Sequence, residues 1–381
     1  MPGFEESYRF RTEIIESRRG NEQRIAQRVN PRRTFRYVGR IRPEDLPGSL
    51  ATILRDPGGA FFVPHFEKAT ALLASAVKAT QNFVPQTIPP WMVPGRGIYL
   101  GGDRAEDLYT VVAVDNAVVS VLQPFRRDYS KGEGVLRAAL VRRTEPARSS
   151  FRTSRVTEPR FEVDEDPVQA WHRDFGTEFP ESFRGAEYFD LAPNWASPAQ
   201  VTAGSRWDNL DFRRGAVDRL FPVPYPTRLV RLSFVLQTED RLNKLLGLFY
   251  RSRGRQKSFY FVSPAHELNP LDLGDETYDG GITVKGVGLR DAYYESTVYR
   301  RVVIRTREGN LIATIADIVE TDGGNSHFVL TPALRPALSF RDIRSVSWLT
   351  RSRFETDRLD IDWRTSTVGE STVVIRSLED D

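Results

Sequence analysis

The sequence contains no cysteine. This absence excludes disulfides, thiolate metal sites, iron–sulfur clusters and a cysteine nucleophile. Long apolar runs are also missing, because no stretch approaches the ~18 residues that a membrane-spanning helix needs. Residues 1–6 lack the basic and apolar regions of a signal peptide. We therefore expect a protein that is made and folded in the cytoplasm, held by packing and hydrogen bonds, with no membrane insertion of its own.

A large charge of one sign is the third absence. The chain has 54 Lys and Arg against 51 Asp and Glu, and arginines alternate with acids, as in residues 104–107 and 239–241. Specific nucleic-acid binding normally needs a clustered basic surface, so it is not expected here. The 381 residues, 40% of them hydrophobic, are enough for two or three domains with their own cores.

An internal repeat is the main positive feature. Residues 35–41 alternate like a strand, 44–55 predict a short helix, Gly58 and Gly59 form a turn, and 61–65 predict an aromatic strand. The same order returns later in the chain. It comprises a strand over 230–236, a helix over 239–252 behind an N-cap at Thr238, a turn at Gly254 and an aromatic strand over 259–262. Leucines and Phe249 give the second helix one apolar face, so we expect it to cover a sheet.

The parallel continues downstream through short strands and turns. The matched pairs are 109–114 and 118–122 with 311–319 and 328–331, 135–141 with 343–349, and 151–156 with 354–359, which share F-x-T-x-R. The sequence thus predicts a mainly β (α+β) protein with two tandem, diverged β-sandwich or open-barrel domains, each with a short flanking helix. We predict a first repeat with an N-terminal arm over 1–165, a connecting arm over 166–226 and a second repeat over 227–381.

The connecting arm is rich in aromatic residues and proline and has no sustained period. Two interpretations remain open: its aromatic side chains pack into their own domain, or they dock on a neighbouring subunit, where aromatic and Arg residues are favoured. The residues concerned are Trp171, Phe175, Phe179, Phe183, Tyr188, Phe189, Trp195, Trp207 and Phe212.

No residue pattern indicates chemistry. The four histidines, His65, His172, His266 and His327, have no G-x-S-x-G serine to accompany them. His65 and His266 follow the two aromatic strands, which favours a shared structural role. The acidic loop at 272–279 lacks calcium-loop spacing, and no phosphate-binding glycine motif is present. We expect no enzymatic activity, no catalytic, metal or cofactor-binding residues, and no cofactor.

Three N-terminal segments, 10–17 (FRTEIIES), 20–24 (GNEQR) and 30–35 (NPRRTF), resemble the start of minor tail proteins of long-tailed phages and prophages. The second repeat, with its helix, its Arg253-Gly254-Arg255 turn and the SFYF strand at 258–261, is similar to the strand–helix–strand module of the same group.

The resemblance implies a distal-tail or baseplate-hub protein of the virion tail, built on tail-tube-like β-sandwiches. It implies a homo-oligomeric ring, either a hexamer or a trimer with pseudo-sixfold symmetry, around the channel through which genomic DNA passes. The tail tube, hub, tape-measure and fibre proteins would be its partners. Two alternatives stay open: a receptor- or glycan-binding tail module, and, less favoured, a cell-wall hydrolase.

Overall fold

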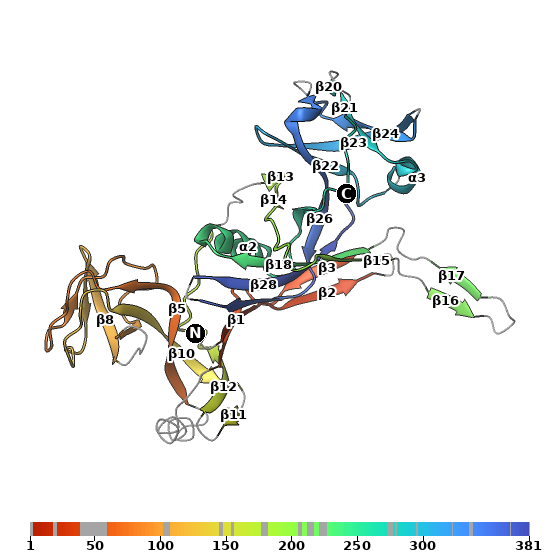
Figure 1. Cartoon of the computed structure of the whole chain (residues 1–381). Coiled ribbons are helices and arrows are strands. Elements are labelled where there is room, and N and C mark those ends of the chain that lie inside the picture. The colour runs from red at the N-terminus through yellow and green to blue at the C-terminus, as the bar shows by residue number, and fades with distance from the viewer. Residues whose placement is uncertain are drawn as a thin grey trace. The chain divides into compact units, whose positions relative to one another are not determined.

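The computed structural model describes most of the chain, and its strands carry the fold. Its described residues are 3–17, 21–38, 59–101, 107–144, 148–153, 156–176, 182–204, 208–211, 217–220, 227–272, 277–278, 280–294, 296–321, 323–334, 338–365 and 367–380. The expected mainly β class is confirmed (Figure 1). The predicted first helix at 44–55 and the turn at Gly58 lie outside the described residues.

Two compact units make up the chain, and neither is one continuous segment. Unit 1 comprises residues 1–9, 32–174 and 360–370, and unit 2 comprises residues 10–31, 175–359 and 371–381. A short piece from the start of the chain thus belongs to unit 2, and a short piece from near its end belongs to unit 1. The predicted limits 1–165, 166–226 and 227–381 do not contain this exchange of segments.

Unit 1 is built around the long strand β10, which pairs with β5 along one edge. Its other edge pairs with β7 at Val135–Ala138 and with β12 at Val141–Arg143. The sheet continues from β7 to β8 and β9, and from β12 to β4 and β1. The strands are β1 (Phe4–Arg9), β4 (Arg32–Val38), β5 (Ala60–Ala71), β6 (Asn82–Phe83), β7 (Gly97–Leu100), β8 (Asp107–Asp115), β9 (Val118–Val121), β10 (Gly134–Arg143), β11 (Arg148–Thr153) and β12 (Val156–Glu165).

Unit 2 is organised around β26 in the same way. β26 pairs with β19 along one edge and with β22 and then β28 along the other. Its strands are β2 (Thr12–Glu16), β3 (Glu22–Ala26), β13 (Ser182–Phe183), β14 (Ala186–Phe189), β15 (Gln200–Gly204), β16 (Asp208–Asp211), β17 (Val217–Leu220), β18 (Thr227–Leu236), β19 (Phe259–Val262), β20 (Thr277–Tyr278), β21 (Gly281–Lys285), β22 (Arg301–Thr306), β23 (Asn310–Thr321), β24 (Asn325–Thr331), β25 (Leu338–Ser339), β26 (Ile343–Phe354) and most of β28 (Gly369–Ser377); β27 (Arg358–Trp363) enters unit 1 at Asp360.

The order of strand pairing is the same in the two units. β1–β4, β12–β10, β10–β5, β10–β7, β7–β8, β8–β9 and β6–β9 correspond to β15–β18, β28–β26, β26–β19, β26–β22, β22–β23, β23–β24 and β21–β24. A two-stranded hairpin also follows the first sheet strand of each repeat in the sequence: β2–β3 lies between β1 and β4, and β16–β17 lies between β15 and β18, although both hairpins belong to unit 2. This shared order supports the repeat that was inferred from the sequence.

Register corrects one of the sequence matches. Phe354 ends β26 opposite Ile375, whereas Phe151 lies within β11, which pairs with β12. The two F-x-T-x-R segments therefore occupy different places in the pairing order. In the same order β27 corresponds to β11, because each forms a hairpin with the next strand, β28 and β12.

The helix predicted over 239–252 is confirmed as α2 (Glu239–Ser252), and the Thr238 side chain accepts a hydrogen bond from the Arg241 amide. Four buried residues, Leu242, Leu245, Leu246 and Phe249, form the expected apolar face. The Phe249 ring lies 5.3 Å from the Phe354 ring of β26, so α2 covers the sheet as expected. A shorter helix, α3 (Leu289–Tyr293), and a 3-10 turn (Phe340–Asp342) complete the described elements.

Much of the predicted connecting arm consists of unit 2 strands. β15 pairs with β18, and β14 pairs with β19 in parallel, placing Tyr188 opposite Tyr260. Tyr188 and Phe189 are buried, and the Phe183 ring packs 5.1 Å from the Tyr260 ring. These aromatic residues pack into their own unit, whereas Trp195 is 60% exposed. Phe179, Trp207 and Phe212 lie outside the described residues.

Candidate functional site

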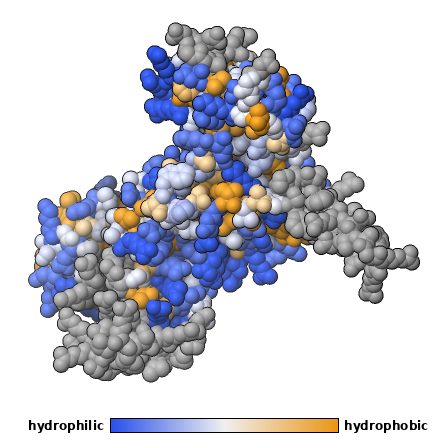
Figure 2. All heavy atoms as spheres, turned by 45° about the vertical axis from the view of Figure 1, so that its right-hand side comes forward, coloured by the Kyte–Doolittle hydropathy of each residue, from blue (hydrophilic) through white to orange (hydrophobic). Residues whose placement is uncertain are grey.

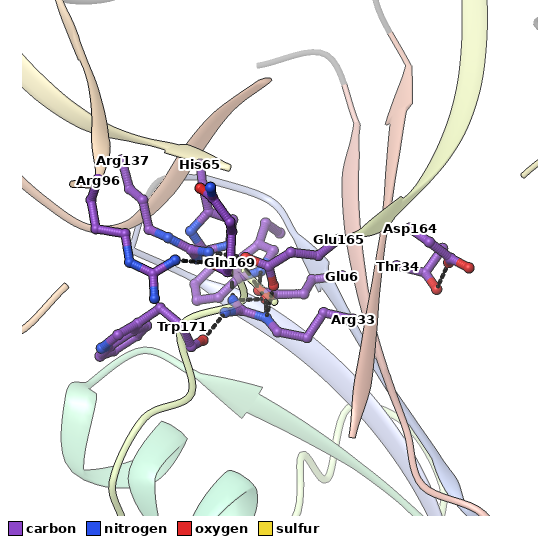
Figure 3. Close-up of polar contacts among 11 residues, drawn as sticks. Glu6, Arg33, Thr34, His65, Arg96, Arg137, Asp164, Glu165, Gln169 and Trp171 are labelled. Atoms are coloured by element: carbon purple, nitrogen blue, oxygen red, sulfur yellow. Dashed lines mark hydrogen bonds and ion pairs between the residues drawn. The ribbon is translucent and has the colours of Figure 1, made fainter. Parts of the chain in front are cut away.

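The strongest concentration of polar side chains is buried inside unit 1 (Figure 3). It consists of five residues from five strands: Glu6 (β1), Arg33 (β4), His65 (β5), Arg137 (β10) and Glu165 (β12). All five are at most 5% exposed. We call these five residues the charged cluster.

Strand periodicity explains how these side chains come to face one another. Side chains two residues apart point to the same face of a strand. Glu6 lies between Phe4 and Tyr8 on the buried face of β1, and Arg33 precedes Phe35 on the buried face of β4. His65 similarly follows Val63 on β5. Each cluster member thus takes a position that the alternation assigns to the core.

Arg33 is the centre of the charged cluster. Its Nε donates to Glu6 Oε1 at 3.0 Å, its NH2 lies 3.1 Å from His65 Nε2, and its NH1 donates to the Trp171 carbonyl oxygen at 2.8 Å. Glu165 pairs with Arg137 and also lies 3.6 Å from Arg33 Nε. Two carboxylates and two guanidinium groups therefore balance in charge, as a buried set must to offset the cost of desolvation.

The environment shifts the pKa values of the cluster strongly. Burial raises the pKa of the Glu6 carboxyl, but the charge of Arg33 and hydrogen bonds from Arg33 and His65 outweigh burial, so its pKa lies far below the usual range. Burial lowers the pKa of His65, against the opposing effect of Glu6. Nearby, burial and the charges of Arg33 and Arg137 lower the pKa of His172 to about 4. A carboxylate and a neutral imidazole result at neutral pH.

Acid–base chemistry would need these groups to meet a substrate. The cluster side chains are at most 3% exposed, and they bond to one another, to the Trp171 carbonyl oxygen and to the Trp363 indole. Such an arrangement positions strands. Removing one partner of a buried pair would leave the other charge uncompensated and would therefore destabilise unit 1.

A reduced version of the charged cluster occupies the same place in unit 2. The neighbours Val38 and Arg160 of β4 and β12 correspond to Ser233 and Thr372, whose hydroxyls lie 3.0 Å apart. The β10–β12 and β26–β28 registers extend this equivalence to the neighbouring strands. In unit 2, Arg228, Ser263, Trp348 and Ser377 take the places of Arg33, His65, Arg137 and Glu165, respectively.

The unit 2 residues keep the central interaction. Arg228 NH2 and Ser263 Oγ each donate to Glu267 Oε1 at 2.6 Å, as Arg33 and His65 both contact Glu6. The position equivalent to His65 is thus Ser263, and the predicted equivalence of His65 with His266 is wrong. His266 lies three residues further along and is exposed.

A second polar site lies where residues 10–31 join unit 2. The Thr12 amide and hydroxyl donate to Asp357 Oδ2 and Oδ1 at 2.6 and 3.0 Å, and Arg255 NH2 donates to the Thr12 carbonyl oxygen at 3.1 Å. Buried Arg353 forms a two-pronged pair with Glu22 at 2.7 and 2.9 Å. Figure 1 shows β2 and β3 close to β28. These contacts fix the β2–β3 hairpin as part of unit 2.

A groove of about 580 Å³ is the third feature, and it lies within unit 2. Exposed Trp195 and His266 line it together with Asp190, Val262, Pro264 and Arg305. An aromatic surface beside a carboxylate, an imidazole and a guanidinium suits a polar ligand with an apolar face.

The remaining predicted positions are scattered. The His327 ring bonds with Thr283 Oγ1 at 3.0 Å on neighbouring strands, far in sequence from the other histidines. Of the acidic loop at 272–279, residues 273–276 and 279 lie outside the described residues. Within the described residues, no group of three or more His, Asp or Glu side chains is placed to hold a metal ion. No helix in that same part of the chain is long and apolar enough to cross a membrane.

Comparison with known proteins found no matching protein-family model and no matching curated protein.

Proposed function

We propose that this chain is a structural component of a phage tail tip, of the distal-tail or baseplate-hub type, which assembles into a ring around the DNA exit channel. The observation that carries the proposal is the shared order of strand pairing in the two units. Two copies of one β-rich fold in one chain provide two similar ring-forming elements. The resemblance of residues 10–35 to minor tail proteins gives this fold its context.

Symmetry follows from the duplication. A ring with six equivalent positions can be completed by three chains that each supply two, or by six chains whose second copies occupy a different position. Both forms connect a tube to a tip by mechanical contact, and neither requires a catalytic step. The charged cluster fits such a role because it ties five strands together inside one unit.

The proposal is tested by mass and by location. Mass photometry and electron microscopy of the purified chain should show three or six chains and class averages with threefold or sixfold symmetry. Gold-labelled antibody against the chain should mark the tail tip of intact particles. Labelling of heads or tube shafts, or absence from particles, would contradict the proposal.

A second function is favoured by one observation, the groove that Trp195 and His266 line. An exposed indole beside Asp190 and Arg305 suits a saccharide, so a receptor- or glycan-binding tail module is the alternative. If it is right, Trp195→Ala should abolish binding on a glycan array. Tyr294→Ala changes an aromatic residue that is 50% exposed and does not line the groove, and it should leave binding unchanged.

A cell-wall hydrolase is the third and weakest candidate. Turnover of purified wall that is lost in the His266→Ala or Asp275→Ala variant would replace the structural proposal by this one.

A further inference from the structure

Both edges of the first strand of unit 1 are occupied. β1 pairs with β4 on one side and with β27 on the other. Ser7 Oγ donates to Asp360, and Trp363 Nε1 donates to Glu6 Oε2 at 3.4 Å. The Trp363 ring also packs on the core of Phe4, Phe35 and Val63. The strand that closes this edge comes from the second copy of the repeat.

The corresponding strand of unit 2 has one open edge. β15, the equivalent of β1, pairs with β18, and within the described residues it has no other strand partner. All five of its residues are exposed, including Val201 at 52%. An open edge presents unpaired amide and carbonyl groups that can receive another strand. Thr202 occupies the place that Ser7 has in β1.

The chain also contains the strand that fits this edge. β11 corresponds to β27, since both form a hairpin with the strand that pairs with β10 or β26. Register along these hairpins gives Arg148 the place of Asp360 and gives Phe151 the place of Trp363. β11 pairs with β12, and among the described residues it has no second strand partner.

We propose that β11 of one chain pairs with β15 of a second copy of this chain, in the way that β27 pairs with β1 in unit 1. A copy of the chain is the occupant because the chain holds both halves of a pairing that it already makes once. The surface suits a contact through strand edges, since Figure 2 shows hydrophobic residues only in small groups among hydrophilic ones on the face drawn. Main-chain hydrogen bonds along the two strand edges would provide the affinity.

The contact joins two different surfaces, so it is heterologous, and repetition of it closes a ring or extends a filament. This inference rests on the proposed ring and adds to it the two strands through which the chains meet. It also explains why, among the described strands, β15 lacks the second partner that β27 gives to β1, and β11 lacks the second partner that β1 gives to β27.

The absence of cysteine from the chain allows a clean cross-linking test. Thr202→Cys and Arg148→Cys are placed in two chains that carry different affinity tags and are co-expressed. Directly opposed residues of paired strands have Cβ atoms within reach of a disulfide. Mild oxidation should give a disulfide-linked pair with one chain of each tag, and pairs of identical chains should be rare.

Two matched controls test which face of β15 the side chain is on and whether the oxidation worked. Ala203→Cys replaces Thr202→Cys in one control and should lose the cross-link, because neighbouring side chains point to opposite faces of a strand. Ser7→Cys with Asp360→Cys in one chain should form a disulfide within the chain and shows that oxidation was effective.

Three results would overturn the inference. A ring or other oligomer without the cross-link between positions 148 and 202 would do so while leaving the tail-tip function in place. Links mainly between two Thr202→Cys chains would replace it by a symmetric β15–β15 contact. A chain that stays monomeric without any interchain link, at the highest concentration reached, would reject it as well; antibody labelling of particles tests the tail-tip function separately.

Discussion

Glu5 and Glu6 are neighbours on β1 and face opposite environments. Glu6 pairs with buried Arg33, whereas Glu5 pairs with half-exposed Arg36 at 3.3 Å. Breaking a buried pair costs about 3–5 kcal/mol, and breaking an exposed pair costs less than about 1 kcal/mol. We therefore expect Glu6→Gln to lower the free energy of unfolding by roughly 3 kcal/mol or more, with Glu5→Gln as the matched control. Urea unfolding measures both. Equal losses would show that the charged cluster adds nothing beyond a surface pair.

His65 makes the stability of unit 1 depend on pH. Burial holds its pKa below the ordinary 6.5, so below that pH the unfolded chain binds a proton that the folded cluster resists. Stability should therefore fall as the pH drops below about 6.5. A second loss should begin below 4.5, where the Glu6 carboxylate is protonated in the unfolded chain first.

The variant His65→Gln separates the two windows. It should reduce the loss between pH 6.5 and 4.5 and keep the loss below 4.5, with thermal unfolding at a series of pH values as the measurement. His172 contributes in the upper window too, since its pKa is about 4, so part of that slope should remain. An unchanged profile in His65→Gln would contradict the assignment.

The charged cluster was visible in the sequence only in part. Glu6, Arg33 and His65 each lie at a position of an alternating strand where an apolar residue is expected, as Glu6 does between Phe4 and Tyr8. A polar residue at such a position indicates a buried polar side chain. That these residues meet could not be predicted, because their contacts span up to 132 positions, between Arg33 and Glu165, and depend on strand register. Of the other three histidines, His172 lies near the charged cluster, whereas His266 and His327 belong to unit 2.

At the scale of elements, a helix or strand could be predicted where the residues that determine it lie within one short segment. The helix α2 was predicted with both its ends, because the spacing of Leu242, Leu245 and Phe249 and the Thr238 cap lie within one short segment. The F-x-T-x-R match failed because a short shared pattern does not carry register. Pairing partners decide equivalence in a sheet, and Phe354 and Phe151 have different partners.

Several of the contacts that hold the β2–β3 hairpin meet at one carboxylate, that of Asp357. Asp357 accepts from the amide and hydroxyl of Thr12 and from the Arg255 amide. Hydrogen bonds to a charged group contribute about 1.5–3 kcal/mol each. Asp357→Ala should therefore speed amide hydrogen exchange across residues 12–26 by at least about tenfold.

The control for this change is Asp362→Ala, which removes only an ion pair with exposed Arg364 at 3.3 Å. That variant should leave exchange in residues 12–26 at the wild-type rate. Slow exchange in the Asp357→Ala variant would mean that the pair between Glu22 and Arg353 holds the hairpin without help.

At the scale of the whole molecule, the sequence predicted two consecutive repeats, and the contacts define two units that exchange short segments. The exchange could not be read from the sequence, since residues 10–31 and 360–370 have the same alternating patterns as the rest. Its consequence is that the two halves of the chain are each incomplete. Residues 10–31 supply Glu22 to buried Arg353, and residues 360–370 supply Trp363 to the unit 1 core.

A chain divided between the copies tests this interpretation. Fragments 1–178 and 179–381 should each be poorly soluble alone, because the second leaves Arg353 buried without Glu22 and the first leaves the Phe4–Phe35 core uncovered by Trp363. Co-expressed, they should purify together through a tag on either one. Replacing residues 10–31 of the first fragment by a short Gly/Ser linker should weaken this association. Two fragments that fold separately and ignore each other would show that each repeat is self-sufficient, and that the exchanged segments are accessories to domains complete without them.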